Sequence, residues 1–118
     1  MKVLINANLI DGNGGPVIND AAVLIDGERI ISAGPRAAAT WPEGTEVVDV
    51  TGLTIMPGLI DCHDHLASKD YTMASRWGLT EPTSLGYLRT AKALEETLLA
   101  GYTCVREAGG LDIGFKQA

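Results

Sequence analysis

Residues 53–67, LTIMPGLIDCHDHLA, decide the fold of this chain. They form a nearly continuous apolar run, interrupted by Pro57-Gly58, that ends in two histidines one residue apart, His63 and His65. Such a run is typical of a strand that is buried on both faces, as in a parallel sheet. We therefore expect a strand that passes through a bend into a second, buried strand with the histidine pair at its end.

The residues before this run predict short strands joined by turns. Partial alternation in 2–10 indicates a first strand, and EVVDVTG at 46–52 indicates another. The firmest local prediction is a hairpin with strands at 22–25 and 29–33, because Asp26-Gly27 between them tolerates the positive φ of a two-residue turn. We expect residues 1–52 to form one β unit.

A helix and a further strand are predicted after the run. A polar loop comes first, followed by a helix that Thr80 can cap, that has Pro82 in its first turn and that ends at Gly101. The segment YTCVRE, 102–107, predicts another buried strand. Strand, helix and strand make a βαβ unit, which implies parallel pairing and a right-handed crossover. The apolar stripe expected on the helix consists of Leu85, Leu88, Ala91, Leu94 and Leu98.

The two histidines are spaced for a shared metal ion. On a strand, Asp61, His63 and His65 lie on one face, and residues two apart are separated by roughly 6.6 Å. Two imidazoles at that spacing can lean together onto one ion at about 2.1 Å each, with Asp61 as outer support. The alternatives are that the histidines are ordinary surface or packing residues, or that both rings bond to loop backbone.

Composition narrows the classes of partner. Fifteen acidic and nine basic residues give a net charge of −6 without a basic cluster, which favours neither nucleic acid nor an anionic membrane. No apolar run reaches membrane-spanning length and the first ten residues do not form a signal-peptide core, so we expect a cytoplasmic protein. Cys62 and Cys104 do not form a CxxC pair and are expected to be reduced, structural thiols.

Three motifs in the same order resemble the amidohydrolase superfamily. IMPGLIDCHDHL, 55–66, is similar to the PG-(L/F)-(I/V)-D-x-H-x-H signature that opens its metal-dependent (β/α)8 barrel. LEETLLAGYTCVREAGG, 94–110, is similar to the helix and second strand of the branch that holds imidazolonepropionase-like enzymes and the Xaa-Pro and Xaa-Arg dipeptidases. The preceding β segment resembles part of the small β-sandwich domain of these enzymes.

The resemblance implies roles for individual residues. His63 and His65 would be metal ligands, zinc being the usual metal with one or two ions, and Asp61 would orient them. Arg106 and Glu107 would end the second strand near the mouth of the site, or pair with each other as an ordinary strand-end ion pair. Glu107 stands where the branch usually has aspartate.

Two aromatic residues and one further departure complete the candidates. Tyr71 and Trp77, in the loop after the histidines, could line a substrate mouth because such loops form the active face of a barrel, or could pack beneath their own loop. Cys104 stands where the branch usually has threonine, which removes a hydroxyl donor.

The chain cannot complete such a site alone. A catalytic zinc needs about three protein ligands, and the chain has only two histidines. A barrel takes roughly 250 residues. The fold class expected is therefore α/β, with 1–52 as part of a β-sandwich and 53–118 as the first strand, helix and second strand of a barrel. The remaining ligands and the base would lie beyond Ala118 or on a second chain.

The function implied is hydrolysis of an amide, peptide or cyclic amide bond in a small-molecule or dipeptide substrate by a metal-activated water. The expected state is an amino-terminal fragment that is inactive alone and, when complete, is a homo-oligomer. One alternative is a non-catalytic structural fragment or split subunit that needs a second chain. Another is a small independent metal-binding module.

Overall fold

The computed structural model describes residues 1–68 and 82–118, which fall into two units, Met1–Pro57 and Gly58–Ala118. The division falls five residues after the expected boundary between 52 and 53, and residues 54 and 55 pair with the first strand of the chain. Among the described residues, no helix is both long enough and apolar enough to span a membrane.

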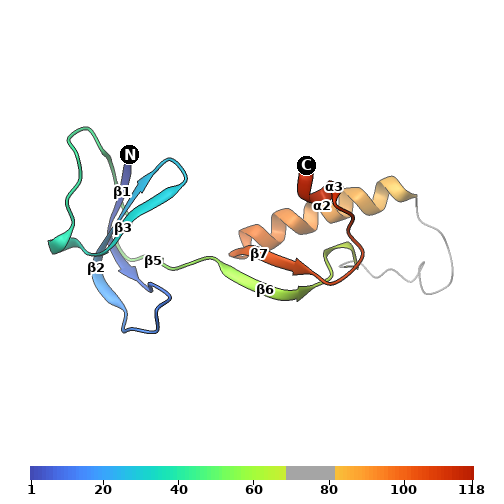
Figure 1. Cartoon of the computed structure of the whole chain (residues 1–118), viewed down its shortest axis with the longest axis horizontal. Helices are drawn as coiled ribbons and strands as arrows, with labels where there is room; N and C mark the ends of the chain where they lie inside the picture. Colours follow the sequence, from blue (N-terminus) through green and yellow to red (C-terminus); the bar gives the residue numbers. More distant parts are fainter. Residues whose placement is uncertain (69–81) are drawn as a thin grey trace. The chain divides into compact units, whose positions relative to one another are not determined.

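The first unit is a five-stranded sheet (Figure 1). Its strands follow the order β3-β2-β1-β4, and β5 also pairs with β1. β1 is antiparallel to β2 and parallel to both β4 and β5, while β2 and β3 form a hairpin. The strands are β1 (Lys2–Leu9), β2 (Ile18–Asp26), β3 (Arg29–Pro35), β4 (Glu46–Asp49) and β5 (Thr54–Ile55), and the short 3-10 turn η1 (Arg36–Ala38) follows β3.

The predicted hairpin is confirmed, with its turn one residue later than expected. Asp26 pairs with Arg29, so the two loop residues are Gly27 and Glu28. Gly27 has φ +56°, a value that glycine adopts without steric cost. The expected strands at 2–10 and in 46–52 are present as β1 and β4.

The core of the first unit lies on β1 and β2. Val3 is fully buried, and Ile5, Ala22 and Leu24 form a cluster with it that Trp41 partly covers. A second cluster, on the neighbouring positions of the same strands, contains Leu9, Ala21 and Val23. Because successive side chains of a strand point to opposite faces, the two central strands bury side chains on both faces.

The second unit is the predicted βαβ arrangement. Strands β6 (Leu59–Asp64) and β7 (Tyr102–Glu107) pair in parallel, with helix α2 (Thr83–Leu99) between them in the chain (Figure 1). α2 packs on β7 and on the 3-10 turn η2 (Leu66–Ser68). A short helix, α3 (Gly114–Gln117), was not predicted.

The ends of α2 differ slightly from prediction. Pro82 is the residue that precedes the helix and not part of its first turn, and the predicted cap Thr80 lies outside the described residues. Gly101 follows the helix with φ +96° and donates its N–H to the carbonyl of Leu98, as a C-terminal glycine does.

The helix that the apolar stripe indicates is present, but much of the stripe is exposed. The buried side chains of α2 are Thr90 and Ala93, whereas Leu88 is 70% exposed and Leu98 is 60% exposed. The side chains that α2 buries are therefore small ones. Periodicity identified an apolar stripe but not which face of the helix the sheet covers.

The prediction that β6 is buried on both faces is also wrong for the described residues. Ile60 is 66% exposed and Leu59 is 40% exposed, because β6 has a single neighbouring strand in this unit. The bend before β6 is as expected. A Cβ on Gly58 would overlap the side chain of Thr103, so only glycine fits beside β7 there.

Candidate metal centre

The histidine pair stands at the end of β6. His63 is in the strand, and His65 is the first residue beyond Asp64, where the strand ends. Both histidines are exposed, which corrects the expectation that they are buried. β6 and β7 are parallel, so their carboxyl ends bring the loops after Asp64 and Glu107 to the same edge of the sheet.

The two rings lean together as the spacing predicts. Nε2 of His63 lies 3.3 Å from Nε2 of His65, and the ring centroids are 5.1 Å apart in an edge-to-face arrangement. Two nitrogens that bind one ion tetrahedrally at about 2.1 Å lie about 3.4 Å apart. The observed separation therefore matches the spacing of two ligands on one ion, and without an ion the same distance allows one ring nitrogen to donate a hydrogen bond to the other.

The second ring nitrogen of His65 has a backbone partner. Nδ1 lies 3.3 Å from the carbonyl oxygen of Gly109, in the loop after β7. A carbonyl oxygen only accepts, so we assign the proton of the neutral ring to Nδ1. Nε2 of His65 then presents a lone pair, the form in which a histidine binds a metal.

Asp61 acts on the backbone and not on a ring. Its Oδ1 accepts the backbone N–H of His63 at 2.9 Å, and Oδ1 of Asp64 accepts that of His65 at 2.7 Å. Both carboxylates therefore fix the main chain that carries the histidines. The predicted contact between Asp61 and an imidazole is not present in the described part of the chain.

Glu107 has a role that the sequence did not indicate. Its two oxygens accept backbone N–H groups from different loops, Leu66 at 2.8 Å and Gly109 at 3.0 Å. The proposed ion pair between Arg106 and Glu107 is not among the ion pairs of residues 1–68 and 82–118. The parallel pairing of the two strands was the signal that could have placed Glu107 beside the residues after His65.

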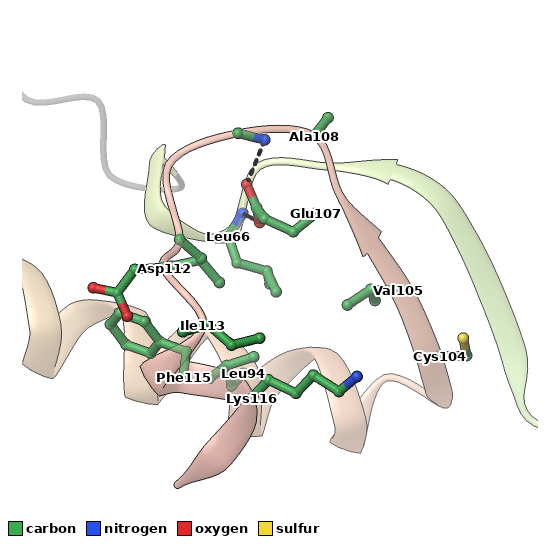
Figure 2. Close-up of a pocket in the computed structure, with 12 residues that line it drawn as sticks. Leu66, Leu94, Cys104, Val105, Glu107, Ala108, Asp112, Ile113, Phe115 and Lys116 are labelled. Atoms are coloured by element: carbon green, nitrogen blue, oxygen red, sulfur yellow. Dashed lines mark hydrogen bonds between the residues drawn. The ribbon is translucent and has the colours of Figure 1, made fainter.

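A cavity of 790 Å³ adjoins this edge of the sheet (Figure 2). Glu107 and Leu66 lie at one end of it, and Figure 2 shows the Glu107 carboxylate directed at the loop that follows Ala108. Leu94 of α2 and Phe115 of α3 form the apolar side. Neither histidine lines the cavity, so it is separate from the space in front of the two imidazoles.

The remaining predicted residues are placed as follows. Cys62 and Cys104 are free thiols, as expected, but both are exposed. Tyr71 and Trp77 lie outside the described residues. Among the described residues, no group of three or more histidine, cysteine, aspartate or glutamate side chains could hold a metal ion. The pair formed by His63 and His65 is thus a two-ligand arrangement here.

Known proteins share both the sequence and the structure of this chain. Imidazolonepropionase of Streptomyces griseus is 38% identical over 86 residues, which are 70% of this chain and 22% of that enzyme. Dihydroorotase of Leifsonia xyli is 31% identical over 132 aligned residues, which cover 97% of this chain and 28% of that protein. No protein-family model matches the chain.

Solved structures of other proteins are also similar to this chain. A prolidase complexed with N-methylphosphonate-L-proline is 35% identical, with a TM-score of 0.82 over 99% of this chain and 28% of its own. A structure described as an amidohydrolase is 32% identical, with a TM-score of 0.81 over 98% of this chain and 27% of its own. The chain spans about a quarter of the length of the proteins it matches. It belongs to the amidohydrolase superfamily and corresponds to an amino-terminal portion of its members.

Proposed function

We propose that the chain supplies the first two metal ligands of a metal-dependent amidohydrolase. The observation that carries the proposal is the 3.3 Å separation of the Nε2 atoms of His63 and His65, which fits one shared ion. The Gly109 carbonyl supports it, because it leaves Nε2 of His65 unprotonated. Zinc is the metal we propose, since imidazole nitrogens suit it.

We further propose that β6, α2 and β7 begin a (β/α)8 barrel and that residues 1–57 are part of a β-sandwich domain. The parallel β6–β7 pair with its connecting helix supports the first assignment. Ile60 on β6 is 66% exposed, and Leu88 on α2 is 70% exposed. Further strands and helices of a barrel would cover these apolar side chains.

The proposed reaction is hydrolysis of an amide, peptide or cyclic amide bond. A bound divalent ion supplies Lewis-acid chemistry, activating water for attack on the amide carbon. In this chain His63 and His65 would hold that ion, and Asp61 and Asp64 fix the backbone of the two histidines. The general base and further ligands are proposed to come from residues beyond Ala118 or from a second chain.

The alternative function is structural: a non-catalytic segment or split subunit that contributes strands to a second chain. Two observations favour it over an independent metal module. The described residues offer no third ligand near the histidines, and the β6–β7 pair leaves apolar side chains uncovered.

Zinc binding by the purified chain tests the metal proposal. Any zinc bound in a calorimetric titration should be one ion per chain and weakly held, because two imidazoles supply fewer ligands than a zinc site needs, and His63→Ala should abolish that binding because one imidazole remains. Cys62→Ala, beside the pair on β6, is the matched control and should bind as the unaltered chain does. Binding that His63→Ala leaves unchanged, or an equal loss with Cys62→Ala, would contradict the proposal. Absence of binding would rule out the independent metal module, because the further ligands are proposed to come from elsewhere.

Amide hydrolysis tests the reaction. The protein is assayed in the chain composition in which it is isolated, against a dipeptide and a cyclic amide, after intact-mass analysis of the polypeptides present. Hydrolysis should disappear with a chelator, return with zinc and be absent in His63→Ala. Hydrolysis that survives both treatments would contradict the proposal, and no hydrolysis with a second polypeptide present would favour the structural alternative.

A further inference from the structure

We infer that Glu107 is the positioning residue that sets His65 as a metal ligand, an inference that rests on the proposed function. Glu107 ends β7, and Asp64 is its partner in the parallel register with β6. Its carboxylate therefore stands beside the residues that follow His65, although the two positions are 42 residues apart in the chain.

The carboxylate joins the two loops that meet at this edge of the sheet. Oε2 accepts the N–H of Leu66, the residue directly after His65, at 2.8 Å. Oε1 accepts the N–H of Gly109 at 3.0 Å. Hydrogen bonds from backbone N–H groups to an ionised carboxylate are roughly twice as strong as neutral ones. Leu66 is 3% exposed, so the first of these bonds is anchored in the packed part of the unit.

The two hydrogen bonds of the Glu107 carboxylate support both the main chain and the imidazole ring of His65. The Leu66 bond fixes the main chain immediately after the histidine, and the Gly109 bond fixes the residue whose carbonyl faces Nδ1. Gly109 has φ +151°, a conformation that glycine adopts readily and residues with side chains rarely do, so the path of this loop depends on the glycine.

Close contact between the loops leaves little freedom for other arrangements. A Cβ on Gly110 would lie 2.9 Å from the Cβ of Ala67, so the loop after β7 passes tightly over the loop after β6. The N–H of Ala108 also donates to the carbonyl of Asp64 at 2.7 Å. Glu107 is the side chain that links these loops at the point where the His65 ring is held.

A consequence follows for the proton on His65. With the Gly109 carbonyl in place, the neutral ring keeps its proton on Nδ1 and its lone pair on Nε2. If Glu107 loses one of its two bonds, the carbonyl is no longer held and the proton redistributes between the ring nitrogens. Outer partners of this kind typically change metal affinity 10- to 100-fold.

The test is Glu107→Gln, which keeps the shape of the side chain but can accept through one oxygen only. Long-range ¹H–¹⁵N spectra of the metal-free chain report the tautomer of His65, and zinc titration reports affinity. The expected result is a lower share of the Nδ1–H form, an upfield shift of the Leu66 or Gly109 amide proton, and zinc affinity weaker by about 10-fold. Glu95→Gln, which removes the same charge from an exposed position on α2, should change neither.

An unchanged His65 tautomer in folded Glu107→Gln would overturn the inference, as would an equal change in Glu95→Gln. If Glu107→Gln does not fold, the His65 tautomer of the unaltered chain is measured instead, and a proton found on Nε2 and not on Nδ1 overturns the inference equally. If the unaltered chain binds no zinc, the tautomer alone decides the positioning role, whereas hydrolysis that survives a chelator contradicts the proposed function.

Discussion

The two units of this chain use their strands in opposite ways. In Met1–Pro57 the central strands bury side chains on both faces, and Val3 and Ala21 are fully enclosed. In Gly58–Ala118 Ile60 is largely exposed, and the Glu107 carboxylate joins the two loops at the strand ends by hydrogen bonds. Burial stabilises the first unit, whereas the second is arranged around a candidate site.

The largest effect should come from the first core. Val3→Ala removes two buried methyl groups and leaves a cavity, so we expect a loss of about 2 kcal/mol in the free energy of unfolding. Val47→Ala, a change of the same size at a residue that is 51% exposed, is the matched control and should cost less than about 0.5 kcal/mol. Urea unfolding measures both, and equal losses would remove the contrast between core and edge.

Two glycines of the second unit differ in the space around them, so alanine should have opposite effects at the two positions. Gly58→Ala forces a Cβ into the side chain of Thr103 and should cost about 1–2 kcal/mol. Gly86→Ala, within α2 where no atom lies within 4 Å of the added carbon, should stabilise by about 0.5–1 kcal/mol. Thermal unfolding followed by circular dichroism distinguishes them. A stabilising Gly58→Ala would show that β6 and β7 do not approach as closely as described.

The exposed stripe on α2 should behave differently from the first core. Leu88→Gln should change the free energy of unfolding by less than about 0.5 kcal/mol, because Leu88 is 70% exposed. It should also reduce self-association measured by light scattering, since it breaks an apolar patch. A loss comparable with that of Val3→Ala would mean that Leu88 is buried in solution.

The smallest effect concerns acid pH. The Thr51 hydroxyl and N–H, with help from Asn6, lower the pKa of Asp49 below its ordinary 3.8. A carboxylate whose folded pKa is depressed stabilises the fold above its unfolded pKa and loses that contribution as pH falls through the folded value. Stability of the first unit should therefore decline below about pH 4, and less steeply in Asp49→Asn. Identical pH profiles would contradict this.

Local features of the fold were predictable from the sequence because their causes are local. Gly27 permits the hairpin turn and Gly101 ends α2, and each is visible in the chain without knowledge of packing. The packed face of α2 was not predictable, because the small side chains at Thr90 and Ala93 compete with an equally periodic leucine stripe. Which stripe a helix buries depends on the surface that it meets.

The candidate site divides in the same way. The i, i+2 spacing of His63 and His65 was sufficient to predict two rings that lean together. The bonds of Glu107 required the register between β6 and β7, which pairs Asp64 with Glu107 and which no local pattern specifies. The Arg106–Glu107 ion pair was one of two alternatives and rested on adjacency alone, whereas adjacent strand residues point to opposite faces.

The most direct test of the account is a zinc titration followed by long-range ¹H–¹⁵N spectra of both imidazoles. If His63 and His65 bind one ion, the Nε2 resonances of the two rings shift together along one binding curve, and Nδ1 of His65 keeps its proton. Rings that shift with different affinities, or only one ring that shifts, would contradict a shared site at the end of β6.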